Sequence, residues 1–178
     1  MSGPYPRRHV LTAVGGAGAL LALGGTASAR NGRRDGASGD QTIVDFALSV
    51  NAETGEFSTL VAALVETGLV AALSGRNQLT VFAPTDAAFA AAGLDADNVG
   101  DLDTAVLTDI LLYHVTRGRR YAASLNDGVA VKMLNGDETE VSVSGGVVVV
   151  NDANVVTPDL EASNGVVHVI GGVLTPPE

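Results

Sequence analysis

The chain has 178 residues, of which 46% are hydrophobic and 17% charged, with a formal net charge of −10 at pH 7 and no cysteine. This acidity argues against a nucleic-acid partner, because nucleic-acid-binding proteins use basic surfaces to neutralise phosphates. Without cysteine the chain has neither a disulfide framework nor lipid attachment through an N-terminal cysteine, so a packed core must hold the fold.

Residues 1–29 have the features of an export signal. Arg7 and Arg8 precede a weakly apolar run at 10–23, and "ASA" at 27–29 supplies the small residues that signal peptidase prefers. The paired arginines of "RRHVL" favour the twin-arginine type. A transmembrane anchor is the alternative, but about 14 apolar residues are too few to cross a bilayer core. We predict an extracellular protein, secreted or cell-surface associated, without a transmembrane span.

The next segment, "RNGRRDGASGD" at 30–40, lacks the apolar residues of a packed element and predicts a flexible linker. A single domain is expected over 41–177. Removing residues 1–29 would take two of the 10 basic residues and none of the 20 acidic ones, leaving a net charge of −12. Strong acidity, with Lys132 as the only lysine, favours a halophilic protein that stays soluble in high salt.

The first half of this domain has helical spacing. Thr42 and Asp45 form a variant capping box in front of one helix, and 57–75 predicts a second, with stops or bends at Gly68 and Gly75. A short strand, a short helix and a longer helix follow, and we expect them over 78–84, 85–93 and 103–115.

The second half changes to runs of β-branched residues. Turn dipeptides separate the runs at Asn135-Gly136, Gly145-Gly146 and Asn164-Gly165. The four valines at 147–150 predict a strand covered on both faces. Helices followed by strands indicate an α+β domain. The expected strands are "VAVKML" at 129–134, "TEVSVS" at 139–144, "VVVVN" at 147–151 and "VVHVIGGVL" at 166–174.

Three segments resemble, in content and order, the conserved boxes of fasciclin-like domains. They are "TVFAPTDAAFA" at 80–90, "LLYHV" at 111–115 and "SNGVVHVIGGVLTPP" at 163–177. The resemblance implies a wedge-shaped domain with a β-sandwich-like core and several helices packed on it, which acts in adhesion without catalysis or cofactor. The signature positions in this chain are Thr80, Phe82, Pro84, Thr85, Asp86, Phe89, Asn164, Gly165 and His168.

Thr85 and Asp86 stand where a strand passes into a helix, a position at which some enzymes hold a nucleophile. A catalytic threonine would need a base, and the domain offers only His114 and His168. We therefore interpret Thr85 as the helix N-cap and Asp86 as an acid that complements the helix dipole. An exported hydrolase acting through Thr85 or His114 is the third hypothesis for function.

The resemblance also implies binding residues. Tyr113 and His114 match the Tyr-His box, implicated in integrin binding by animal members, and Asp159 and Leu160 match their Asp-Ile motif. Core packing is the alternative for Tyr113 and His114, and a turn or bulge acid beside a strand is the alternative for Asp159. His168 is interpreted as a core or edge histidine on its strand. Two glycines, Gly171 and Gly172, stand where the family usually has an acidic residue.

The acidic stretch "LDADNVGDLD" at 94–103 was compared with a calcium-binding EF-hand loop. Asp95, Asp97 and Gly100 fit that pattern, but Val99 and Val106 occupy ligand positions. A solvated acidic loop, with Asp103 capping the next helix, is the better interpretation. No metal site is predicted.

The leading hypothesis is a non-catalytic binding domain in cell-surface adhesion or in extracellular matrix or biofilm organisation. Its expected partner is a cell-surface or matrix protein, a polysaccharide or a second copy of itself. The alternative is an extracellular carrier of an apolar small molecule such as a carotenoid or a lipid, held between helices and sheet.

Overall fold

The computed structural model describes residues 40–177. The predicted signal at 1–29 and nearly all of the predicted linker lie outside the described residues. No helix among the described residues is long and apolar enough to cross a membrane.

Five α-helices and two short 3-10 helices lie among the described residues, most of them in the first half of the domain. Local caps explain several of the helix starts. Thr42 and Asp45 make the predicted capping box, and Asp103 Oδ1 accepts a hydrogen bond from Ala105 N at 2.8 Å. The predicted second helix is divided at Gly68, which has a φ of +68°. The elements are α1 (Ile43–Thr54), α2 (Ser58–Glu66), α3 (Val70–Leu73), α4 (Asp86–Ala91), η1 (Val99–Asp101), α5 (Thr104–Tyr113) and η2 (Ala122–Ser124).

A seven-stranded sheet runs in the order β2-β1-β7-β6-β5-β4-β3. Its pairs are antiparallel except the central β1–β7 pair, which is parallel. A single bridge between Thr116 and Met133 joins its two ends, so the sheet curls almost into a barrel. The α+β prediction is confirmed. The strands are β1 (Leu79–Pro84), β2 (Val115–Arg117), β3 (Val129–Lys132), β4 (Glu138–Ser144), β5 (Val147–Val150), β6 (Ala153–Ala162) and β7 (Gly165–Ile170).

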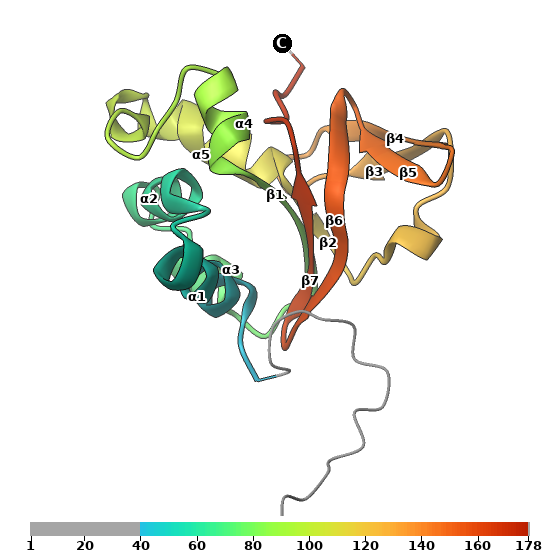
Figure 1. The fold of residues 1–178 in the computed structure, drawn as a ribbon, viewed down its shortest axis with the longest axis horizontal. Coiled ribbons are helices and arrows are strands. Elements are labelled where there is room, and N and C mark those ends of the chain that lie inside the picture. The colour runs from blue at the N-terminus through green and yellow to red at the C-terminus, as the bar shows by residue number, and fades with distance from the viewer. Residues whose placement is uncertain (1–39, 178) are drawn as a thin grey trace, which may run out of the picture. The chain divides into compact units, whose positions relative to one another are not determined.

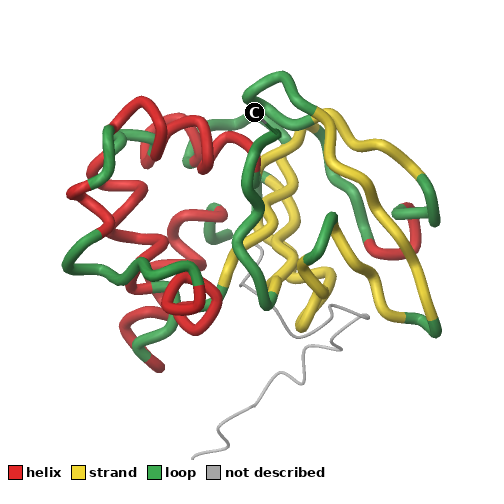
Figure 2. Tube along the Cα trace, turned by 90° about the horizontal axis from the view of Figure 1, so that it is seen from above, coloured by secondary structure: helices red, strands yellow, loops and turns green. Residues whose placement is uncertain are grey.

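The central strands β1 and β7 are buried on both faces and separate two hydrophobic cores. Helices α1, α2 and α3 lie on one side of these strands, and the hairpins of β3, β4 and β5 lie on the other (Figure 1). The view from above shows the same division (Figure 2). Val81 and Val167 face the helical core, whereas Phe82 and Ile170 face the interior of the curled sheet. Because successive side chains of a strand point to opposite faces, each central strand contributes side chains to both cores.

One prediction about the strands is wrong. In β5 only Val148 and Val150 are buried, and Val147 is 47% exposed, so the strand is not covered on both faces. The reason is the curl of the sheet, whose inner face is filled while the outer face of β5 meets solvent. The sequence pattern also does not predict β2 or β6. The latter contains Pro158, a residue that normally argues against a strand, and its ladder shifts register there.

Thr85 and Asp86 of "TVFAPTDAAFA" cap the starts of two different helices. Thr85 is the N-cap of α4, and its Oγ1 accepts from Ala88 N at 3.2 Å, as predicted. Asp86 instead reaches α2, whose own N-cap residue, Phe57, provides no side-chain cap. Its carboxylate accepts hydrogen bonds from Ser58 N, Ser58 Oγ and Thr59 N at 2.9–3.0 Å. Asp86 thus joins α4 to α2 across 28 residues of sequence.

Replacing Asp86 by alanine should destabilise the domain by about 2 kcal/mol, because α2 loses a charged cap that no nearby residue replaces. Burial raises the pKa of the Asp86 carboxyl, but hydrogen bonds from Thr59 and Ser58 outweigh it and hold that pKa below its ordinary value. Urea unfolding at pH 7 measures the loss. Asp109→Ala is the matched control, since Asp109 is exposed on α5; equal losses in both variants would refute the capping role.

Candidate functional site

Tyr113 ends α5 with its ring inside the curled sheet, and its side chain is 2% exposed. Its hydroxyl donates to the carbonyl oxygen of Glu138 at 3.1 Å and accepts from Asn151 Nδ2 at 3.0 Å. Asn151 belongs to the turn between β5 and β6 and has a φ of +50°. The phenol therefore ties α5 to two parts of the sheet. The geometry matches the core-packing alternative for this residue.

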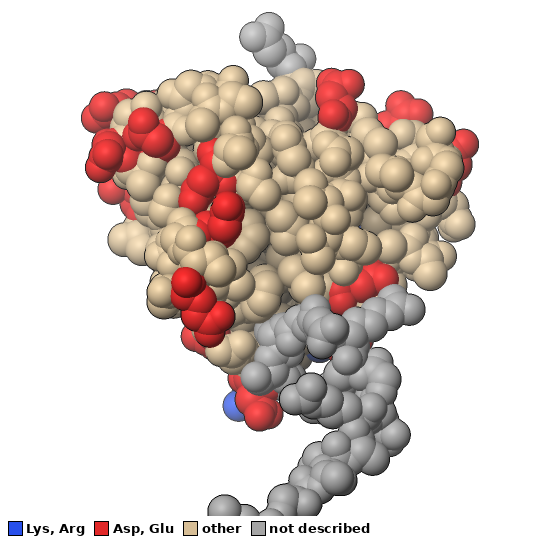
Figure 3. Space-filling view, viewed as in Figure 1, with Lys and Arg blue, Asp and Glu red and all other residues tan. Residues whose placement is uncertain are grey.

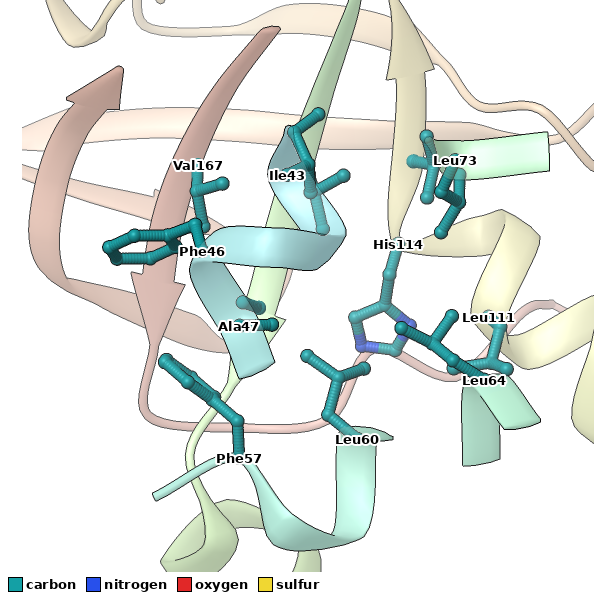
Figure 4. Close-up of a pocket in the computed structure, with 13 residues that line it drawn as sticks. Ile43, Phe46, Ala47, Phe57, Leu60, Leu64, Leu73, Leu111, His114 and Val167 are labelled. Carbon is teal, nitrogen blue, oxygen red and sulfur yellow. The ribbon is translucent and has the colours of Figure 1, made fainter. Parts of the chain in front are cut away.

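His114 follows Tyr113 but faces the helical side, where Leu60, Leu64 and Leu111 surround its ring (Figure 4). Its Nδ1 lies 2.8 Å from the carbonyl oxygen of Ile110, and its Nε2 accepts from Leu174 N at 2.9 Å. These partners require the neutral tautomer with the proton on Nδ1. Burial lowers the pKa of His114 to about 4, against the opposing effect of the Ile110 carbonyl. The ring is a neutral structural link between α5 and the C-terminal segment.

Asp159 and Leu160 lie on β6 where its pairing with β7 is irregular, as the bulge alternative proposed. Asp159 has a φ of +59° and is 6% exposed. Its Oδ1 accepts from Ala122 N at 2.7 Å, so the carboxylate faces inward and holds the start of η2. Leu160 is half-buried, opposite Val167 in the ladder, and packs on the helical core.

His168 lies within β7 and is fully buried, stacked on Phe82 with ring centroids 5.5 Å apart. Its Nδ1 accepts from Asp159 N at 3.2 Å, and its Nε2 lies 2.7 Å from the carbonyl oxygen of Arg120. Burial lowers the pKa of His168, although the Arg120 carbonyl and the Asp159 charge oppose this. The ring thereby links the irregular part of β6 to the loop that contains Arg120.

Thr80, on β1, also holds the loop that contains Arg120. Its Oγ1 donates to the carbonyl oxygen of Gly118 and accepts from Arg120 N, both at 2.8 Å. Residues of the first and last family boxes, Thr80 and His168, therefore fix both backbone groups of Arg120. The family resemblance marks both residues as signature positions but gives no sign of these contacts, which join residues 40 and 48 positions apart.

Neither of the two histidines in the described part of the chain is free to act as a base for Thr85. All four ring nitrogens of His114 and His168 contact backbone groups, and Thr85 Oγ1 caps α4. A nucleophilic hydroxyl needs a base within hydrogen-bond reach that is free to take its proton. The geometry therefore offers no support for the hydrolase hypothesis.

The acidic loop at 94–103 uses its oxygens locally. Asp95 Oδ1 accepts from Asp97 N at 3.0 Å and from Asn98 N at 2.9 Å, which closes a turn. Asp103 caps α5, as the sequence predicted.

Gly171 N donates to the carbonyl oxygen of Asn154, and a Cβ at Gly171 would lie 2.9 Å from Asn154 Oδ1. Asn154 thus crowds the position where the family usually has an acid.

A small apolar cavity lies between the helices and the central strands (Figure 4). Ile43 and Phe46 of α1, Leu60 of α2 and Val167 of β7 are among its lining residues. Its volume of about 20 Å³ leaves room for little more than one water molecule. A larger apolar molecule could enter only if α1 or α2 moved away from the sheet.

Comparisons with known proteins agree with this architecture. Residues 55–176 match the family model described as the fasciclin domain. Protein sll1483 of Synechocystis is 44% identical over 144 residues, which cover 77% of this chain and 78% of that protein. The pig transforming growth factor-beta-induced protein ig-h3 is 41% identical over 136 residues, covering 76% of this chain but 19% of that protein. The solved FAS1 domain pair of the insect cell adhesion molecule fasciclin I has the same fold, with a TM-score of 0.58 at 18% identity, covering 75% of this chain and 50% of that one.

Proposed function

The chain belongs to the fasciclin domain family, and from this premise we propose that it is an exported, non-catalytic binding domain of cell-surface adhesion or matrix organisation. The observation that carries the proposal is that the polar side chains considered for a functional site point into the fold. Tyr113, His114, Asp159 and His168 are buried and hydrogen-bonded, so they build the fold rather than a reaction centre.

If the domain binds a partner, the contact must therefore use exposed groups around these residues. Tyr113, His114 and Asp159 would then act by shaping the surface above them, and half-buried Leu160 is the one member of the predicted binding set that reaches it. A single domain bridges two surfaces only through two faces or self-association, so one contact of low affinity becomes effective when many copies act together.

Beads coated with the purified domain should bind cells of the producing organism and cluster them at its growth salinity. Beads coated with an unrelated acidic protein of similar net charge are the control, because charge alone could alter attachment in salt. The measurement is the fraction of cells bound per bead. Equal attachment to both kinds of bead would contradict an adhesive surface.

A second candidate, an extracellular carrier of an apolar molecule, is supported by the apolar lining of the cavity between helices and sheet. It requires that cavity to open, because its present volume is that of about one water molecule. Extraction of the protein purified from its native source distinguishes the two functions. A pigment or lipid in stoichiometric amount would establish the carrier, and a colourless protein without extractable lipid would leave the adhesive function.

A further inference from the structure

Three of the five basic residues in the described part of the chain line one pocket. Acidic side chains are spread over the face shown in Figure 3, whereas basic side chains are visible there only near the lower edge. Arg117, Arg120 and Lys132 line a single pocket of about 300 Å³. That volume is at the small end of the range of about 300–1,000 Å³ usual for ligand pockets. The pocket suits a compact group rather than a large ligand.

The pocket lies at the seam where the two ends of the curled sheet meet. Arg117 comes from the end of β2 and Lys132 from the end of β3, and an isolated bridge between Thr116 and Met133 joins these two segments. Thr116 Oγ1 donates to the carbonyl oxygen of Lys132 at 2.7 Å, and Leu134 N donates to that of Val115 at 2.8 Å. The backbone that carries the two cations is therefore held in place before any ligand binds.

Arg120 is the third cation, and the family boxes position it. Thr80 Oγ1 accepts from its N–H, and His168 Nε2 contacts its carbonyl oxygen. Its Nε is buried and has no hydrogen-bond partner among the described residues. An unpaired buried donor on a cation is costly, and an anionic acceptor in the pocket would offset that cost.

The two nearest carboxylates in the sheet and its turn make no ion pair with this cluster. Glu138 stands opposite Lys132 in the β3–β4 ladder, and Asp137 accepts from Asn135 Nδ2 within the adjoining turn. Within residues 40–177, the structure shows no ion pair between either acid and Arg117, Arg120 or Lys132. Three basic residues from three backbone segments therefore line one hollow without an ion pair to Asp137 or Glu138.

We propose that this seam pocket, formed by Arg117, Arg120 and Lys132, binds a tetrahedral oxyanion, a sulfate or phosphate group. Two guanidinium groups and one ammonium match a group with several acceptor oxygens and up to two negative charges better than they match a single carboxylate. The group can be a free anion or a substituent of a matrix polysaccharide. The site goes beyond the proposed adhesive function and does not depend on it.

Titration with sodium sulfate at constant ionic strength, with chloride as the replaced ion, tests the site by NMR. We expect saturable shifts of the backbone amides of residues 116–120 and 132–136. Arg117→Gln and Lys132→Gln should each weaken sulfate binding about fivefold or more, because each removes one charged contact. The matched control is Arg76→Gln, which removes the same charge from an exposed residue that does not line the pocket.

Shifts that do not saturate, or an equal loss of binding in Arg76→Gln, would overturn the proposal, because either result indicates general ionic attraction. A second arm compares dextran sulfate with unmodified dextran and with free sulfate. Binding to dextran sulfate more tightly than to an equal concentration of free sulfate groups supports a site for a polymer-borne anion. If dextran sulfate and free sulfate bind equally well per sulfate group, the result supports a site for the free anion. Unfolding curves of the variants that match the parent exclude loss of fold as the cause.

Discussion

Replacing Gly165 by alanine should cost the domain at least about 3 kcal/mol of its free energy of unfolding, a large share of the about 5–15 kcal/mol typical of domains. Gly165 begins β7 beside Leu79 of β1. A Cβ there would overlap the carbonyl oxygen of Leu79 and lie 2.6 Å from Ile43 Cδ1. The clash involves backbone of the central parallel pair, so a side-chain rotation cannot relieve it.

Urea unfolding of Gly165→Ala beside Gly75→Ala measures this effect. Gly75 is the matched control because a Cβ there would lie 3.4 Å from the nearest carbonyl oxygen, that of Ala72, and Gly75 does not have a positive φ. We expect Gly75→Ala to change the free energy of unfolding little. A Gly165→Ala protein as stable as Gly75→Ala would show that β1 and β7 are not packed this closely.

Acid should weaken the domain between pH 6.5 and about 4 through His114. Burial lowers the pKa of His114 from its ordinary 6.5 to about 4, so in this window the unfolded chain binds a proton that the folded chain does not. The stabilising contribution of the neutral His114 ring is therefore fully present above pH 6.5. It is lost as the pH drops toward 4, which lowers the free energy of unfolding by about 3 kcal/mol for this one ring. His168, whose pKa is also lowered by burial, acts in the same direction.

The free energy of unfolding of the parent and of His114→Gln, measured from pH 7 to pH 4, tests this origin of the acid sensitivity. Glutamine does not titrate, so the variant should show a shallower pH dependence. His168 supplies part of what remains, and near pH 4 the carboxyls of Asp45 and Asp86, whose pKa values are also lowered, supply the rest. The His114 ring resonances of the parent give a second measurement that does not require the variant to fold. A ring that titrates near pH 6.5 in the folded protein would contradict the buried neutral tautomer.

Local signals in the sequence identified much of the fold. The caps made by Thr42 and Thr85 depend on residues within three positions, so residue type and spacing were enough to predict them. The Gly145-Gly146 turn was equally direct, because two residues with positive φ close that hairpin. These elements need no knowledge of distant partners.

The features that the sequence did not predict depend on residues far apart in the chain. Asp86 caps a helix 28 residues away, a contact that no local pattern encodes. Asn164 lies in the turn that the Asn164-Gly165 dipeptide predicts, but its side chain does more. Its Oδ1 accepts from Ile43 N and its Nδ2 donates to the carbonyl oxygens of Leu73 and Gly75. Gly165 itself allows two strands to approach rather than making the turn, since Ala162 pairs with it directly.

The candidate site was predicted only in part. Sequence resemblance selected Tyr113, His114, Asp159 and Leu160, but burial depends on how the sheet curls, which periodicity does not reveal. The seam pocket was missed because Arg117 and Lys132 come from strands at opposite ends of the sheet order. Lys132 was noticeable as the only lysine, yet nothing in the sequence brought it beside Arg117 and Arg120.

Deletion of the gene in the producing organism tests the proposed adhesive function most directly. Surface attachment, aggregation and biofilm mass are measured at growth salinity in the parent, the deletion strain and a strain in which the intact gene is restored. We expect reduced attachment and biofilm in the deletion strain, with recovery when the gene is restored. A deletion strain that attaches, aggregates and forms biofilm as the parent does would contradict it.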